Sequence, residues 1–76
     1  IARNYAEALR RRGDAALERR AWDLAAADFA RASELDPERS TYALLAALVP
    51  YRRGRWKDAE AALASVIERF PGEAEA

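Results

Sequence analysis

The sequence predicts an all-α protein, and three observations support this class. Alanine is the largest contributor to the 51% of hydrophobic residues, and it favours helices, whereas a β-sheet core would need valine, isoleucine and threonine. Long segments such as residues 21–35 contain neither glycine nor proline. Apolar side chains also recur at steps of three and four residues, the period of one helix face. We therefore expect helices throughout and no strand.

A first helix is expected before a turn at Arg19 and Arg20. Its apolar stripe consists of Tyr5, Leu9, Gly13, Ala16 and Leu17. The second helix is expected over residues 22–35, with a stripe consisting of Trp22, Ala25, Ala26, Phe29, Ala32 and Leu35. Gly13 and Ala25 have little or no side chain, which predicts close contact between these two helices. Pro37 ends the second helix, because proline cannot continue it and disfavours helical geometry in the preceding residue.

The third helix is expected to begin with Ser40 or Thr41 as its cap and to run toward Arg53. Pro50 lies inside it, where it removes a backbone hydrogen bond and crowds a carbonyl of the preceding turn. This predicts either a kink near the third turn or an early end of the helix. The fourth helix is expected over residues 56–70.

A shift of the chain by 34 residues superimposes its two halves. Trp22 falls on Trp56 and Pro37 falls on Pro71, and several smaller or charged residues also match. Repeats at a fixed period of this length are typical of helical repeat proteins. We expect one domain over residues 1–76, with repeats at residues 6–39 and 40–73 and the start of a possible third repeat at residues 74–76.

Each repeat resembles a tetratricopeptide repeat. The matching positions of the first repeat are Gly13, Trp22, Ala25, Phe29, Ala32, Leu35, Asp36 and Pro37, and those of the second are Gly54, Trp56, Ala59, Leu63, Val66, Phe70 and Pro71. The resemblance implies a right-handed α-solenoid of two helical hairpins and a role in protein–protein interaction. Four positions depart from the family pattern, which are Arg12, Arg20, Ala47 and Pro50.

The composition argues against several function classes. Thirteen basic and thirteen acidic residues balance, which is unlike the basic footprint of a nucleic-acid binder. With 34% charged residues and no long apolar run, no transmembrane helix is expected. Histidine and cysteine are absent, so we expect no metal, cofactor or enzymatic activity. The carboxylate pairs Asp14 with Glu18 and Asp23 with Asp28 are interpreted as exposed ion-pair ladders.

The resemblance places the first and third helices on a concave face, where this family binds peptides or partner helices. The candidate residues on this face are Arg10, Arg11, Asp14, Thr41, Leu44, Leu45, Leu48, Tyr51 and Arg52. The leucines would serve either as anchors for a partner or as part of the protein's own core. The alternative function is a structural spacer or a self-association segment in a larger protein.

The excess of arginine, with Lys57 the only lysine, points to a GC-rich bacterial genome.

Two further surfaces are candidates. A basic edge is expected at the turns within the two hairpins, formed by Arg19, Arg20, Arg53, Arg55 and Lys57. These residues either complement helix dipoles at the ends of the first and third helices or dock an acidic partner or anionic lipid. The second surface is a terminal interface on the fourth helix, formed by Leu63, Val66, Ile67 and Phe70. We expect a further repeat, a second copy or a partner to cover it.

Overall fold

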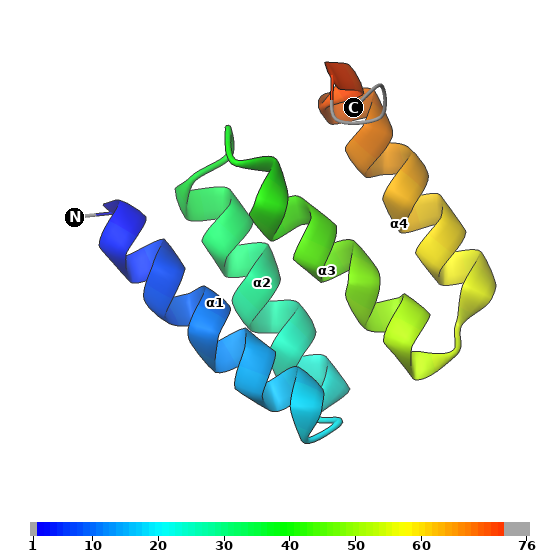
Figure 1. Cartoon of the computed structure of the whole chain (residues 1–76), viewed down its shortest axis with the longest axis horizontal. Helices are drawn as coiled ribbons and strands as arrows, with labels where there is room; N and C mark the ends of the chain where they lie inside the picture. The colour runs from blue at the N-terminus through cyan, green and yellow to red at the C-terminus, as the bar shows by residue number, and fades with distance from the viewer. Residues whose placement is uncertain (1, 73–76) are drawn as a thin grey trace.

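The computed structural model describes residues 2–72, and within them it contains helices and no strand. The helices are α1 (Ala2–Glu18), α2 (Trp22–Leu35), α3 (Ser40–Arg53) and α4 (Trp56–Arg69). Consecutive helices pack against each other, and α1 and α4 lie at opposite ends of the row (Figure 1). The predicted all-α class is confirmed, and the arrangement is consistent with a helical repeat. The predicted start of a third repeat at residues 74–76 lies outside the described residues.

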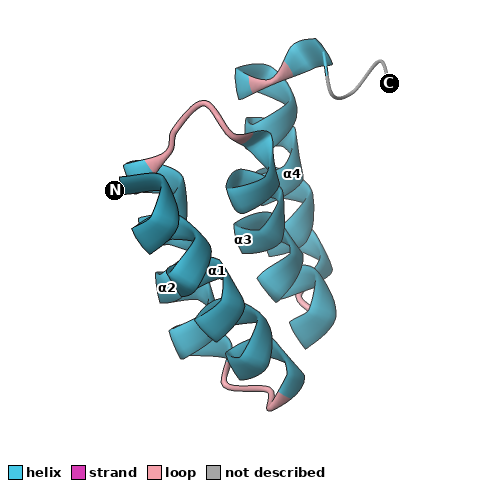
Figure 2. Ribbon diagram, turned by 60° about the vertical axis from the view of Figure 1, so that its left-hand side comes forward, coloured by secondary structure: helices cyan, strands magenta, loops and turns pink. Residues whose placement is uncertain are grey.

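The side view shows the same order of helices, with α1 and α2 on one side and α3 and α4 on the other (Figure 2). The Cα atoms span 29 × 28 × 17 Å, so the molecule is a slab of side-by-side helices. A closed bundle would instead bring α4 back against α1. The two outermost helices of the slab therefore each have a side that no other described helix covers.

The predicted starts of α2 and α4 at Trp22 and Trp56 are confirmed, and α4 ends at Arg69, one residue before its predicted end. The predicted cap of α3 is wrong. Ser40 is already the first helical residue, and Arg39 occupies the cap position without a side-chain capping hydrogen bond. Of the two outcomes expected at Pro50, the early end of the helix is wrong, because α3 continues for nearly one more turn to Arg53.

The turns after α1 and α3 have the same backbone structure at positions 34 residues apart. After α1, the N–H of Arg20 donates to the carbonyl of Leu17 at 3.0 Å, and Ala21 donates to Ala16 at 2.8 Å. After α3, Gly54 donates to Tyr51 at 3.0 Å and Arg55 donates to Pro50 at 2.9 Å. Both pairs form the Schellman motif, whose central residue is left-handed. That residue is Arg20 with φ 62° in one turn and Gly54 with φ 87° in the other.

The core follows the row of helices as three adjoining clusters. The first joins α1, α2 and α3 through Ala6, Leu9, Ala32 and Tyr42. The second lies in the middle of the slab and contains Ala16, Ala25, Phe29 and Val49. The third joins α3 to α4 through Ala43, Ala47 and Val66. The helices are held mainly by small side chains, which allow their backbones to approach closely.

Gly13 is the clearest example of such close approach. A Cβ atom added to this residue would lie 2.6 Å from Cε1 of Phe29, which is shorter than any allowed carbon–carbon contact. Phe29 is completely buried and therefore has no room to move aside. The predicted contact between the first two helices at Gly13 is confirmed.

Asp28 corrects the sequence analysis, which placed it among exposed ion-pair positions. The residue is buried, with 3% of its surface exposed. Its two carboxylate oxygens accept hydrogen bonds from Nε and Nη2 of Arg12, each at 2.9 Å. The charge at position 12, where the repeat pattern expects an apolar residue, therefore has a structural role as the partner of a buried carboxylate.

Candidate partner-binding surfaces

The α1 half of the predicted concave face is an ion-pair network. Arg10 donates to Oε1 of Glu7 at 2.6 Å and to Oδ2 of Asp14 at 2.5 Å. The hydroxyl of Tyr42 on α3 donates to the other oxygen of Glu7 at 3.0 Å. Arg10 thus pairs with both Glu7 and Asp14, and the hydrogen bond from Tyr42 to Glu7 ties this network on α1 to α3.

The electrostatics of this network follow from its hydrogen bonds. The bonds from Arg10 and then Tyr42 lower the pKa of Glu7 below its ordinary value of 4.5. Burial, followed by the bond to Glu7, raises the pKa of Tyr42 above 10.0. At neutral pH the network therefore contains an ionised Glu7 and a neutral Tyr42. A ligand carboxylate brought to Arg10 would have to compete with Glu7 and Asp14.

The α3 half of the predicted face divides between core and surface. Leu44 packs against the third core cluster and Leu45 against the second, and both are half-buried. Leu48 is 37% exposed and Tyr51 is 50% exposed. The remaining predicted members of the face are exposed, which are Arg11, Thr41 and Arg52. Of the predicted leucine anchors, only Leu48 is left largely at the surface.

The predicted basic edge is exposed at all five positions, which are Arg19, Arg20, Arg53, Arg55 and Lys57. A polar hollow of about 530 Å³ lies between the two turns and is lined by Leu17, Glu18, Arg20, Trp22, Arg52 and Arg53. Asp23 approaches Arg53 at 3.9 Å and Asp58 approaches Arg55 at 3.8 Å. The last turn of α3 contains Arg52 and Arg53, whereas α1 ends at Glu18, directly before Arg19 and Arg20. Arg19 directly follows the last residue of α1, and its N–H donates to the carbonyl of Ala15, so the dipole role stays a prediction for this helix.

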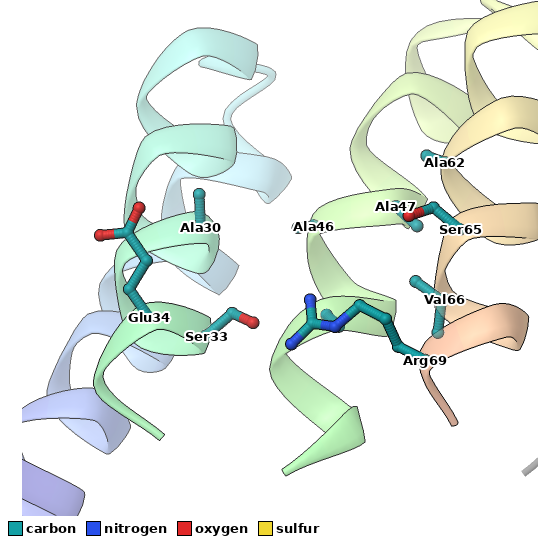
Figure 3. A pocket seen from close by; sticks show the side chains of 10 residues that line it. Ala30, Ser33, Glu34, Ala46, Ala47, Ala62, Ser65, Val66 and Arg69 are labelled. Carbon is teal, nitrogen blue, oxygen red and sulfur yellow. The ribbon is translucent and has the colours of Figure 1, made fainter. Parts of the chain in front are cut away.

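A groove of about 340 Å³ lies between α2 and α4, with α3 as its floor. The floor is made of alanines, among them Ala46 and Ala47 (Figure 3). Ser33 and Glu34 line the α2 wall, and Arg69 reaches across from the α4 wall. The Nη2 atom of Arg69 also donates to the carbonyl of Pro37 at 3.4 Å. The groove is shallow, and polar groups stand on both of its walls.

The predicted terminal interface on α4 is only partly a free surface. Val66 is buried against α3, and Leu63 and Phe70 pack against the same cluster. The guanidinium carbon of Arg69 also lies 5.1 Å from the centre of the Phe70 ring. Of the four predicted residues, Ile67 alone is mainly exposed, at 52%. Of the predicted interface residues, Val66 therefore belongs to the core instead of to a free surface.

A different set of residues forms an apolar surface on the outer side of α4, which we call the α4 face. It surrounds a hollow of about 420 Å³ and is formed by Tyr51, Trp56, Ala59, Glu60, Leu63, Ala64 and Ile67. Trp56 is 63% exposed, and its ring meets that of Tyr51 edge-on, with centroids 5.3 Å apart. Only Glu60 in this set is charged. Large exposed apolar side chains grouped in this way are typical of interaction surfaces.

Most of the α4 face was missed by the sequence analysis, although the repeat contains a signal for it. The face occupies the positions 34 residues after Leu17, Trp22, Ala25, Ala26, Phe29, Ala30 and Ser33. The earlier set lies largely in the second core cluster, beneath α3. Comparing the two sets in the sequence would have shown that the later set has the residues of a core surface but no helix within the repeats to pack on it.

Within residues 2–72, no group of three or more acidic side chains is arranged to hold a metal ion. No helix in the described part of the chain is long and apolar enough to cross a membrane. Comparison of the chain with models of known protein families, with curated protein sequences and with solved structures finds no match.

Proposed function

We propose that this chain is a protein-interaction module that binds a partner polypeptide through the α4 face. The observation that carries the proposal is the exposure of Trp56, Ile67 and Tyr51 around one apolar hollow. Tryptophan and tyrosine are the residues that most often dominate protein–protein binding energy. Fully burying a side chain of this size is worth roughly 1.5–3 kcal/mol, so covering this hollow strongly favours association.

The tetratricopeptide resemblance supports the same class of function. We include in the proposal a right-handed solenoid in which α1 and α3 line the concave side. Tyr51 belongs both to the predicted concave surface and to the α4 face, and Leu48 lies one helical turn before it. A partner on the α4 face would therefore extend onto the exposed end of the concave surface.

The test is co-purification with three matched variants that each place an aspartate on one exposed helix surface. Ile67→Asp alters the α4 face, Leu48→Asp alters the concave surface, and Leu24→Asp is the control. Leu24 is 39% exposed and corresponds in the repeat to Asp58, so the control introduces a residue that the fold already accepts there. Circular dichroism checks that all three remain folded, and a captured partner is then purified and titrated.

We expect Ile67→Asp to lose a specific partner that the wild type and Leu24→Asp retain. Loss of the same partner only in Leu48→Asp would move the binding site to the concave surface and contradict the α4 face. The alternative function is a structural spacer or self-association segment. It would be favoured if all three variants kept the same partners, or if sedimentation showed oligomers of the wild type that Ile67→Asp dissociates.

A further inference from the structure

The occupant of the α4 face can be deduced from the other half of the molecule, because the fold already contains a covered copy of this surface. The corresponding surface on α2 is centred on Trp22, Ala25 and Phe29, and all three lie in or against the second core cluster. Trp22 is half-buried where Trp56 is exposed. This inference rests on the proposed function and specifies the partner.

A helix covers the α2 surface. The residues of α3 that pack there are Leu45, Ala46 and Val49, and Tyr42 packs against the neighbouring Ala32. These four occupy positions i, i+3, i+4 and i+7 of α3, which is one stripe of a helix. The small residue at i+4 allows the backbones to approach. The α2 surface is therefore a site for an amphipathic helix with large anchors at i, i+3 and i+7.

We propose that the α4 face binds an amphipathic helix of a partner protein in the position that α3 takes on α2. The partner helix has apolar residues at i, i+3 and i+7, a small or basic residue at i+4, and a basic side chain directed at Glu60. The basic side chain follows from the one charge difference between the two surfaces. Glu60 stands where Ala26 lies against the second core cluster, so a carboxylate faces the docked helix and favours a cation beside it.

A second copy of the chain is a poorer occupant by the same geometry. Stacking copies head to tail would place α1 of one copy on α4 of the next. The positions of α1 that correspond to Leu45, Ala46 and Val49 are Arg11, Arg12 and Ala15, and all are exposed. Such an interface would set two arginines and an alanine against Trp56, Leu63 and Ile67, without a large apolar anchor. One of the two arginines already pairs with Asp28.

The test uses a synthetic peptide with the sequence of residues 40–53 and Pro50→Ala to permit a regular helix. The protein carries Trp22→Phe, so its fluorescence reports Trp56 alone. We expect saturable binding with a blue shift of the Trp56 emission. The peptide that carries both Leu45→Asp and Val49→Asp should bind at least about a hundredfold more weakly, since each of the two buried anchors is worth at least about a factor of ten.

Two further comparisons locate the peptide. Ile67→Asp in the protein should weaken binding about tenfold or more, whereas Leu24→Asp should leave it unchanged. A peptide with Ala46→Arg should bind roughly three- to tenfold more tightly than its parent, as expected for a charge-assisted hydrogen bond to Glu60. Glu60→Gln in the protein should remove that gain and leave the parent peptide's affinity unchanged.

Several results would overturn the inference. Binding that is insensitive to Ile67→Asp would mean that the peptide displaces α3 instead of occupying the α4 face. Absence of saturable binding up to millimolar peptide would exclude a helix docked in this way. Oligomers that Ile67→Asp dissociates would make a second copy the occupant. If the peptide fails while a purified partner still requires Ile67, the proposed function stands and only the helical occupant is wrong.

Discussion

The two hairpins are built from one repeat, yet they differ in how much of their second helix is covered. In α2, the buried residues are Ala25, Asp28, Phe29 and Ala32, because α1 and α3 pack on either side. In α4 only Ala59 and Val66 are buried. The same pattern of residues thus produces a core where a neighbouring helix covers it, and an exposed apolar surface where no helix of the described residues does.

The paired positions within the hairpins also differ in a coordinated way. Gly13 and Phe29 of the first hairpin correspond to Ala47 and Leu63 of the second. The larger Phe29 thus faces a glycine, and the smaller Leu63 belongs to the hairpin that has an alanine at the matching position. Arg12 and Asp28 correspond to Ala46 and Ala62, so both members of the ion pair are replaced together. Within each hairpin the two residues of a pair therefore fit each other, and substituting residues of one hairpin by those of the other tests this fit.

The largest effect is expected at the aromatic residue in the middle of the slab. Phe29→Ala should destabilise the protein by about 3–5 kcal/mol, because Phe29 is completely buried and its removal leaves a cavity. Leu63→Ala should cost only about 1–2 kcal/mol, since one side of Leu63 already faces the open hollow. Urea denaturation followed by circular dichroism measures both. Because total stability at this size is small, Phe29→Leu provides a milder version that stays folded, and equal losses at positions 29 and 63 would refute the difference in cover.

A smaller effect is expected from the ion pair between α1 and α2. Arg12→Ala leaves the buried carboxylate of Asp28 without its donors and should therefore destabilise the protein. The double variant Arg12→Ala/Asp28→Ala reproduces Ala46 and Ala62 of the second hairpin and should recover much of that loss. A double-mutant cycle in urea measures the coupling. Additive effects of the two single variants would show that the pair behaves as an ordinary surface contact.

The turn after α1 should allow a gain in stability. Arg20 holds a left-handed backbone conformation that is unfavourable for any residue with a side chain, and the matching turn uses Gly54. Arg20→Gly is expected to stabilise the protein by up to about 1 kcal/mol, which corresponds to a rise in Tm of roughly 4–8 °C for a domain of this size. Arg19→Gly serves as the control and should not raise Tm. An unchanged or lower Tm for Arg20→Gly would mean that the arginine side chain stabilises the turn.

The smallest effect is expected in the pH dependence of the stability that Glu7 contributes through its bonds to Arg10 on α1 and Tyr42 on α3. The pKa of Glu7 is lowered in the folded protein by Arg10 and Tyr42, so the stability it contributes is fully present above its ordinary value of 4.5. That contribution is lost as pH falls through the lower folded pKa. The difference in Tm between the wild type and Glu7→Gln should therefore shrink below about pH 4.5. A difference that stays constant down to pH 2 would exclude the ionised network as its source.

Much of the fold could be predicted because it depends on local signals. Trp22 and Trp56 mark helix starts through the repeat, and Pro37 marks a helix end through its own covalent structure. Asp28 could not be placed so easily, because its burial depends on Arg12 in another helix, and a single-helix pattern treats aspartate as exposed. Its position three residues after Ala25 and four before Ala32 puts it beside the buried stripe, and that is the local signal that was available.

The candidate site was harder to predict than the fold for a related reason. Whether Leu45, Leu63 or Trp56 is core or surface depends on which helix lies next to it, and one helical stripe looks the same in both cases. The hydrogen bond from Tyr42 to Glu7 joins residues far apart in the sequence, and the repeat contains no equivalent pair to indicate it. The covered surface of α2 and the open surface of α4 can be told apart only when it is known which helix packs next to each.

The packing of each helix mainly against its neighbours in sequence also has a kinetic consequence. Contacts that are local in sequence form quickly, so the chain should fold in microseconds to milliseconds. Opening should begin at α4, which packs against α3 alone among the described helices and is joined to the loop before α3 by a long hydrogen bond from Arg69 to Pro37. Amide protons of α4 would then exchange with solvent fastest and those of α2 slowest, a gradient of local stability along the row of helices. A ligand bound to the α4 face would slow the exchange of the α4 amide protons and so reduce the difference in local stability between α4 and α2.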